Sequence, residues 1–208
     1  MTSKSINIKI GVLALQGAFE EHIEMLESIG IDTVEIRLPH ELQGLDGLIL
    51  PGGESTTMSK LLGRWNLMQP IREWVKKGKP IWGTCAGMIL LSDTIGGGGV
   101  KDQESIGGLH AVVHRNIFGA QVHSFETQLK GPPGFQDKPY HAVFIRAPAL
   151  VTIHSDMVQV LEHVEYEGNH QAIVAAQQNN VLVTAFHPEL TKDTRWHRYF
   201  VSLISKEP

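Results

Sequence analysis

The sequence predicts an α/β fold: a single-domain three-layer sandwich with a largely parallel central sheet and antiparallel additions. Across residues 8–91, short apolar runs rich in β-branched residues alternate with segments of helical periodicity, which is typical of a parallel sheet covered by helices. From residue 109 onward, strand-like runs follow one another without long helices between them, which favours antiparallel pairing. We expect residues 1–208 to form one domain.

In the first part of the chain, the expected elements end at recognisable signals. The strand 8–15 ends at Gln16-Gly17, and the helix that follows ends at Gly30, where a helix C-cap belongs. Further strands are expected at 33–38, 47–50 and 80–83, and helices at 55–62, 67–77 and 85–91.

The second part begins with a glycine-rich loop, 95–108. It is no dinucleotide-binding fingerprint, because it does not sit tightly between a strand and a helix. The expected strands are 109–114, 140–145, 158–166, 171–176 and 181–186, and a final helix covers 193–204.

Composition excludes several classes of function. The formal net charge is −4 and no basic stripe is present, so we expect no nucleic-acid binding. No apolar run approaches the roughly 18–20 residues that span a bilayer, and we expect no secretory signal. The single cysteine excludes an internal disulfide and indicates a reducing compartment, the cytoplasm. The 11 histidines are scattered without an H-E-x-x-H motif, so we expect surface and loop histidines and no metal site.

The run Gly83-Thr-Cys-Ala-Gly87 is the strongest local signal of chemistry. It follows an expected strand and opens an expected helix, the geometry that projects a nucleophile from the carboxyl edge of a sheet. A helix N-terminus favours the reactive thiolate. A buried, inert cysteine is the alternative interpretation. The motif predicts Cys85 as a nucleophile.

The run Phe186-His-Pro-Glu189 supplies the partners that such a thiol needs. His187 and Glu189 follow an expected strand, and side chains at i and i+2 of extended backbone point to the same side. We expect Pro188 to hold the chain out of helix. The histidine can then accept the thiol proton and the carboxylate can fix its tautomer.

The run Pro51-Gly-Gly-Glu-Ser-Thr56 lies between an expected strand and an expected helix. Paired glycines allow unusual dihedrals and close approach of backbone N–H groups, which could bind an oxyanion. A phosphate loop would require G-K-[ST] and no adjacent carboxylate, so Glu54 argues against it. A plain turn is the remaining alternative.

Together these motifs resemble those of class I, triad-type glutamine amidotransferases. Within that superfamily the sequence is similar to the glutaminase subunits of pyridoxal 5'-phosphate synthase. The similarity is carried by the runs 11–19, 51–56, 82–87, 115–119, 124–126, 144–148 and 186–190. The runs 11–19 and 144–148 are specific to this subfamily, whereas the Cys and His-x-Glu elements identify only the superfamily.

The resemblance implies a role for each matching residue. The catalytic triad is matched by Cys85, His187 and Glu189. Glutamine-binding positions are matched by Gly52, Gly53, Glu54, Arg115, Ile145 and Arg146, and the oxyanion hole by Gly53 and Ala86. Arginine suits the α-carboxylate of glutamine because its planar fork binds both oxygens.

The resemblance also implies partners. L-glutamine is the substrate, and the ammonia passes to a separate (β/α)8-barrel synthase subunit in a large hetero-oligomer. No metal or organic cofactor is implied in this chain, since pyridoxal phosphate is the product made on the partner. Ala120 stands where the family usually has arginine, which puts substrate affinity or partner contact in doubt.

Other interpretations stay open. A glutaminase subunit of another pathway, or a free γ-glutamyl hydrolase, would keep the triad, although the runs 16–19 and 144–148 favour the vitamin B6 branch. A non-catalytic α/β protein with a reactive cysteine would not need a His-x-Glu pair. A glutamine hydrolysis assay separates this last class from the others.

Overall fold

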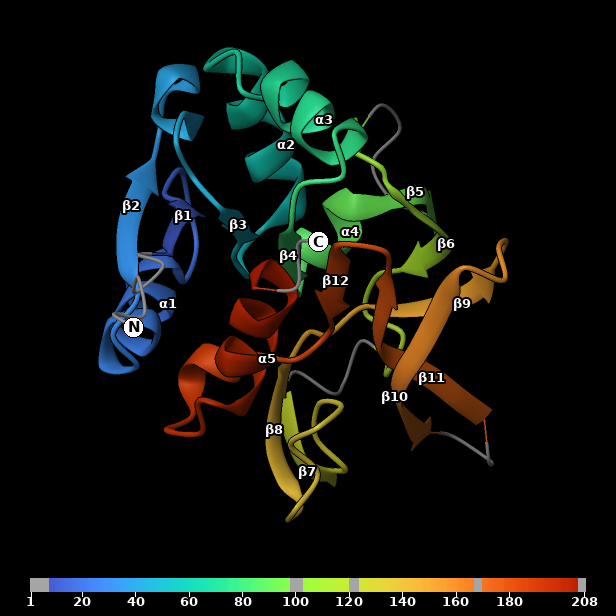
Figure 1. The fold of residues 1–208 in the computed structure, drawn as a ribbon. Coiled ribbons are helices and arrows are strands. Elements are labelled where there is room, and N and C mark those ends of the chain that lie inside the picture. The colour runs from blue at the N-terminus through green and yellow to red at the C-terminus, as the bar shows by residue number, and fades with distance from the viewer. Residues whose placement is uncertain (1–7, 98–102, 120–123, 167–169, 206–208) are drawn as a thin grey trace.

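A twisted ten-stranded sheet forms the centre of the computed structural model, which describes residues 8–97, 103–119, 124–166 and 170–205 (Figure 1). The strand order is β2-β1-β3-β4-β12-β11-β9-β6-β5, with β10 paired to β11. The strands from β2 to β12 in this order are parallel, while β11 pairs antiparallel with β12, β9 and β10. The predicted α/β class, with a largely parallel sheet and antiparallel additions, is confirmed.

The elements have the following bounds. The strands are β1 (Lys9–Leu13), β2 (Asp32–Ile36), β3 (Gly47–Leu50), β4 (Ile81–Thr84), β5 (Ser92–Gly96), β6 (Leu109–His114), β7 (Ser124–Leu129), β8 (Tyr140–Ile145), β9 (Ala149–Ile153), β10 (Val158–Tyr166), β11 (His170–Gln178) and β12 (Val181–Thr184). The helices are α1 (Phe19–Ser28), α2 (Ser55–Arg64), α3 (Met68–Lys76), α4 (Ala86–Leu91) and α5 (Arg195–Ile204), with 3-10 turns η1 (Pro39–Leu42) and η2 (Pro188–Leu190). No helix in these described ranges is long and apolar enough to cross a membrane.

The side chains of β4 point alternately to the two faces of the sheet and show which helices cover each face. Trp82 and Thr84 face α1 and α5, because Trp82 packs on Phe200 and Thr84 contacts His22. Gly83 faces the opposite side, where a Cβ atom on it would lie only 2.4 Å from the backbone of Gly87 in α4. The sheet therefore lies between α1 and α5 on one face and the α4 layer, joined by α2 and α3, on the other.

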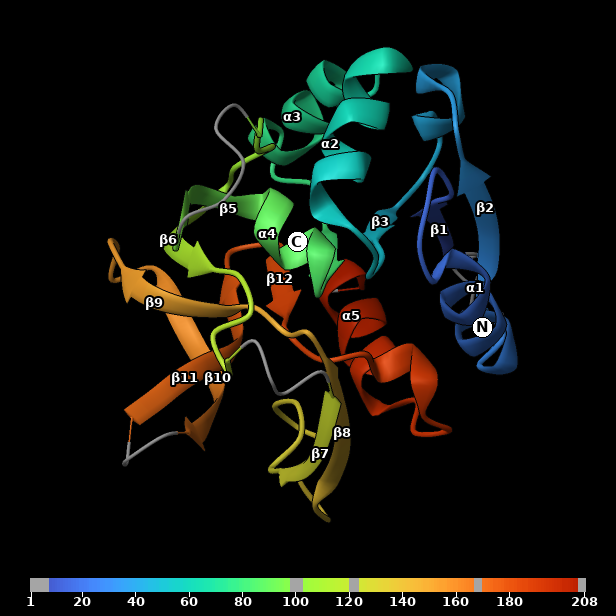
Figure 2. The same cartoon turned by 180° about the vertical axis from the view of Figure 1, so that it is seen from behind.

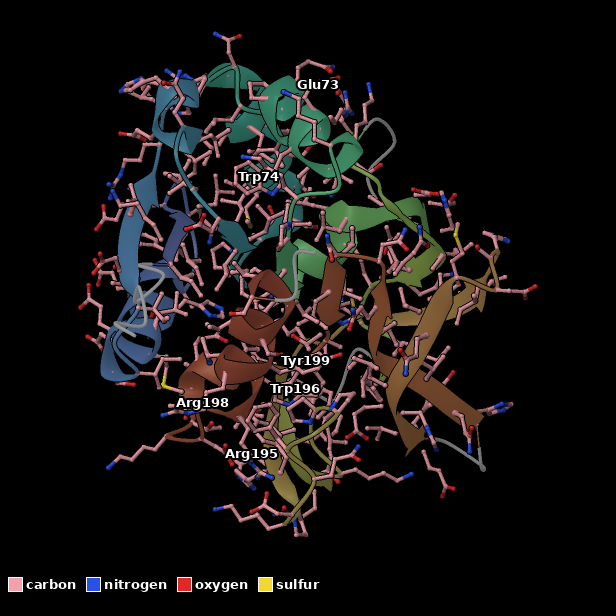
Figure 3. All side chains as sticks on the ribbon, viewed as in Figure 1. Glu73, Trp74, Arg195, Trp196, Arg198 and Tyr199 are labelled. Carbon is pink, nitrogen blue, oxygen red and sulfur yellow. The ribbon has the colours of Figure 1, made fainter. Side chains whose placement is uncertain are left out.

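Both helical layers bury one face and expose the other. In Figure 3, Trp74 of α3 points into the molecule and the neighbouring Glu73 lies on its surface. Trp196 and Tyr199 of α5 are likewise buried, whereas Arg198 is on the exposed side of the same helix (Figure 3). This pattern is the amphipathic stripe of a helix that packs on a sheet.

Strands β7 and β8 form a separate antiparallel ladder rather than an addition to the main sheet. It lies at the end of the molecule opposite α2 and α3 (Figures 1 and 2). The prediction for 140–145 was therefore right about the strand and wrong that it adds to the central sheet. Phe125 and Phe144 stack across this ladder with ring centroids 4.5 Å apart.

Three strands were missing from the sequence prediction: β5, β7 and β9. The loop predicted at 95–108 begins too early, because β5 continues to Gly96 and pairs parallel with β6. Residues 98–102 of that loop lie outside the described part of the chain.

Candidate active site

Cys85 sits in a strained turn between β4 and α4. Its φ is +46°, a conformation that non-glycine residues rarely adopt and that occurs at functional sites. The Cys85 N–H donates to the Thr184 carbonyl of β12 at 2.8 Å. A Cβ atom on Gly87 would lie 2.2 Å from the Leu50 carbonyl oxygen, so the flanking glycine permits close helix–strand packing. The turn thus holds the thiol at the carboxyl end of β4.

A cavity of about 410 Å³ opens at this edge of the sheet. Seven of the predicted site residues line it: Gly53, Glu54, Cys85, Arg115, Ile145, Arg146 and His187. The prediction did not single out four other lining residues: Gln16, Ser55, Ile89 and Asn116. Gln16 follows β1, so the rule that ligands bind beyond the carboxyl ends of parallel strands could have found it.

His187 and Glu189 are buried and hydrogen bonded to each other. His187 Nδ1–H donates to Glu189 Oε1 at 2.7 Å. The expectation that Pro188 keeps the chain out of helix is wrong, because Pro188 begins η2. Proline is tolerated at a first helical position, where its missing N–H is not needed. A tight turn, rather than extended backbone, brings the two side chains together.

The pKa values of this pair indicate that both groups are ionised. Burial lowers the pKa of His187, but hydrogen bonds to Cys85 and Glu189 raise it to about 10. Burial raises the pKa of Glu189, but the neighbouring His22 and the hydrogen bond to His187 lower it overall. An imidazolium held by a carboxylate is the arrangement that stabilises a thiolate beside it.

The Gly52-Gly53 loop is shaped by close approach and not by unusual dihedrals. Neither glycine has a left-handed φ, contrary to our expectation. A Cβ atom on Gly52 would lie 2.4 Å from His187 Cε1, and one on Gly53 would lie 2.5 Å from Gln16 Oε1. The Gly52 carbonyl accepts a hydrogen bond from Ala18 N–H at 3.0 Å. The β1–α1 turn therefore fixes the loop against the histidine.

Glu54 combines a structural role with a place in the cavity wall. Its carboxylate caps α2, accepting hydrogen bonds from Thr56 N–H at 3.0 Å and Thr57 N–H at 2.8 Å. Burial raises its pKa, but hydrogen bonds from Thr57 and Thr56 lower it to about 2. The cavity wall therefore carries a carboxylate that is ionised at neutral pH.

Two arginines give the same cavity positive charge. Arg115 donates to Gln103 Oε1, and its buried Nε–H has no protein partner among the described residues. Arg146 is exposed and has a φ of +45°, a second strained backbone at this site. Ala120, the departure from the family pattern, lies outside the described residues.

The expectation of surface and loop histidines is wrong for two of them. His22 in α1 and His197 in α5 have 0% exposure and lie behind Glu189. Each falls within the apolar stripe of its helix, a signal that the sequence did contain. The described residues hold no group of three or more His, Cys, Asp or Glu side chains suited to a metal.

Known proteins match the chain over nearly its whole length. The profile of the SNO glutamine amidotransferase family matches residues 12–206. The pyridoxal 5'-phosphate synthase subunit PdxT of Listeria innocua is 54% identical over 93% of this chain and 97% of its own. The subunit of the same name from Carboxydothermus hydrogenoformans is 50% identical over 96% and 99%. A crystal structure of a glutamine amidotransferase is 44% identical, with a TM-score of 0.84 over 94% of this chain and 98% of that one.

The raised pKa of His187 predicts a pH-dependent contribution to stability. Ionised His187 stabilises the fold fully below its unfolded pKa of about 6.5, and this stabilisation disappears as pH rises through about 10. In urea unfolding between pH 6.5 and 10, the stability difference between wild type and His187→Asn should therefore shrink with rising pH. In a Cys85→Ala background this stability difference should shrink at a lower pH, because one cause of the raised pKa of His187 is removed. A difference that is constant with pH contradicts the prediction.

Proposed function

The chain belongs to the SNO glutamine amidotransferase family, and from this we propose that Cys85, His187 and Glu189 form the catalytic triad of a glutaminase. The reaction converts L-glutamine and water to L-glutamate and ammonia. The observation that carries the proposal is the strained Cys85 thiol in one cavity with His187, whose Nδ1 is held by a buried carboxylate.

The chemistry proceeds in two steps. The Cys85 sulfur attacks the side-chain amide carbon of glutamine, and His187 donates its proton to the departing nitrogen, which leaves as ammonia. A γ-glutamyl thioester remains on Cys85. His187 then takes a proton from water, the resulting hydroxide attacks the thioester carbon, and the C–S bond breaks to release glutamate and to restore the Cys85 thiolate beside protonated His187. Glu189 fixes the tautomer of His187 and stabilises its charged form.

We place the oxyanion hole at the N–H groups of Gly53 and Ala86. Ala86 is the first residue of α4, and first-turn N–H groups have no partner within a helix. The orientation of the Gly52–Gly53 peptide is coupled to the hydrogen bond between Ala18 N–H and the Gly52 carbonyl. Donors aimed at developing negative charge typically contribute about 10²–10³ in rate.

The charges of the cavity wall suit a free amino acid. Glutamine carries an α-carboxylate and an α-ammonium group, and the wall offers two arginines and one ionised carboxylate. We assign Arg115 and Arg146 to the carboxylate and Glu54 to the ammonium. Gly52, Gly53 and Ile145 complete the glutamine contacts in this proposal.

The relatives named as pyridoxal 5'-phosphate synthase subunits support a proposal for the destination of the ammonia. We propose that this chain is the glutaminase subunit of such a synthase and passes ammonia to a (β/α)8-barrel subunit in a large hetero-oligomer in the cytoplasm. We also propose that residues 1–208 act as one glutaminase domain. A hydrophobic core that extends from β1 to α5 and the family match over 12–206 support this.

Replacing Cys85 with alanine should abolish glutamate release while the variant still folds and unfolds cooperatively, because alanine lacks the nucleophile and fits the space of the buried thiol. A glutamine-analogue electrophile should label the wild type at Cys85, as located by peptide mass spectrometry. An adduct elsewhere, or wild-type turnover in the Cys85→Ala variant, would refute the assignment.

Arg115→Met and Arg146→Met should each lower kcat/KM for glutamine about ten- to a hundredfold, the typical effect of losing a hydrogen bond to a charged group. The matched control is Arg198→Met, since Arg198 is exposed and does not line the cavity. Steady-state glutamate release measures all three. Unchanged kinetics in both cavity variants would remove the arginines from substrate binding.

The isolated chain should be a poor glutaminase that the barrel subunit activates. Turning the Gly52–Gly53 peptide requires breaking the Ala18–Gly52 hydrogen bond, which a docked partner can compensate. Mixing the subunits at saturating glutamine should raise kcat by up to about 10²–10³, the typical contribution of an oxyanion donor. Equal kcat values with and without the partner would exclude this control.

A further inference from the structure

Two fully buried histidines, His22 and His197, lie beyond Glu189, and the mechanism above does not use them. His22 Nε2 lies 3.4 Å from Glu189 Oε2 and 3.2 Å from Thr84 Oγ1. His22 Nδ1 lies 3.0 Å from His197 Nε2. The pair joins α1 and α5, from opposite ends of the chain, to the carboxylate behind the active site.

The carboxylate needs a donor on its second oxygen. Glu189 Oε1 accepts the Nδ1–H of His187, while Oε2 is buried and has no well-aligned hydrogen bond. An ionised carboxylate only accepts, and a buried oxygen without a donor is costly. His22 Nε2 lies 3.4 Å from Oε2, and its hydrogen-bond partner is Thr84 Oγ1. Thr84 Oγ1, which shares this nitrogen, already accepts from Trp82 Nε1–H at 3.2 Å.

One arrangement of protons gives Glu189 Oε2 a donor and leaves no buried ring N–H of the two histidines unpaired. If His22 carries its proton on Nε2, then His22 Nδ1 accepts from His197 Nε2–H, and the unpartnered buried His197 Nδ1 is a bare nitrogen. In the opposite tautomers His22 Nε2 would accept from the Thr84 hydroxyl, but its lone pair would then lie beside the carboxylate, which would have no donor for Oε2. These tautomers would also leave an N–H at His197 Nδ1 buried without an acceptor, which is rare in folded proteins.

Both imidazoles are neutral in this arrangement. Burial lowers the pKa of His22 most strongly; Glu189 and Glu21 act to raise it, and His187 to lower it. Burial and the neighbouring His22 hold the pKa of His197 well below its usual value. His22 therefore offers a neutral donor, which stabilises the carboxylate without removing the negative charge that His187 requires.

We propose that His22 is a positioning residue of the glutaminase: its Nε2–H holds Glu189 Oε2, and His197 fixes the tautomer in which His22 can do so. The proposal rests on the function assigned above. With both carboxylate oxygens held, Glu189 cannot rotate, and the ring of His187 stays aligned with the Cys85 thiol. The group thus extends from Cys85 through His187, Glu189 and His22 to His197.

Paired substitutions distinguish a donor from a space-filling side chain. Glutamine places an N–H near the position of histidine Nε2, whereas leucine fills similar volume without a donor. His22→Leu should lower kcat about ten- to a hundredfold, as expected for losing a hydrogen bond to a charged group, with KM unchanged. His22→Gln should retain most of kcat. Rates are expressed per active site, counted by stoichiometric labelling of Cys85 with a glutamine-analogue electrophile.

The pH profile provides a readout that a purely structural role would not change. Without the second donor Glu189 binds its proton more tightly, so the acidic limb of kcat/KM should move to higher pH in His22→Leu and return in His22→Gln. The assay uses the chain mixed with the barrel subunit. Equal losses in the two variants, or an acidic limb that stays in place in His22→Leu, would overturn the proposal.

Nuclear magnetic resonance tests the proton arrangement without any reliance on turnover. Two-bond ¹H–¹⁵N correlation spectra of the ¹⁵N-histidine-labelled full chain report the tautomer of each ring, and the His22→Gln and His197→Gln spectra assign the signals. Both rings should be neutral Nε2–H tautomers between about pH 6 and 9, a range in which an ordinary histidine with a pKa of about 6.5 would titrate. An Nδ1–H or charged His22 would overturn the proposal even if His22→Leu failed to fold. A wild type without glutaminase activity would instead refute the proposed function, and the spectra would still be readable.

Discussion

The buried carboxylate of Glu189 is the group on which the arrangement of the site depends. A charged group at 5% exposure is stable only when polar partners surround it, so the elements around it are constrained together. Its nearest ionisable neighbours, His187 and His22, come from the end of β12 and from α1. His22 in turn contacts α5 through His197. Through these contacts the buried carboxylate connects α1 and α5 to the centre of the sheet.

The active edge of the sheet follows from parallel pairing. Strands β1, β3, β4 and β12 run in the same direction, so the residues after each of them meet at one edge. Gln16, Gly53, Cys85 and His187 are the residues that this geometry brings to one cavity. The close packing there leaves no room for side chains at Gly52 or Gly87. Backbone strain at Cys85 and Arg146 is stored where surrounding hydrogen bonds and packing can hold it.

The parallel half of the fold was predictable because its central strands β3, β4 and β12 are buried along their whole length and apolar on both faces. Strand β3 was predicted with its observed bounds, 47–50. The missing strands lack this pattern. β7 pairs only with β8 and alternates between exposed and half-buried residues, and β5 continues directly from α4 with Asp93 and Gly96 within it. β9 joins the sheet through pairing with β6, a partner far along the chain that periodicity does not identify.

The part of the site that lies in short sequence motifs, the proposed triad of Cys85, His187 and Glu189, was predictable from the sequence. Cys85 and His187 follow strands whose carboxyl ends adjoin, and local spacing brings Glu189 to His187. The residues behind the second carboxylate oxygen of Glu189, His22 and His197, could not be predicted in the same way. They are 175 positions apart, and only the folded chain brings their ring nitrogens to within 3.0 Å. The sequence does contain one unusual feature: the apolar stripes of α1 and α5 each include a histidine, His22 and His197. A buried polar group in such a stripe requires a hydrogen-bond partner. A nearby buried group with no hydrogen bond among the described residues is Oε2 of Glu189, the carboxylate that holds His187.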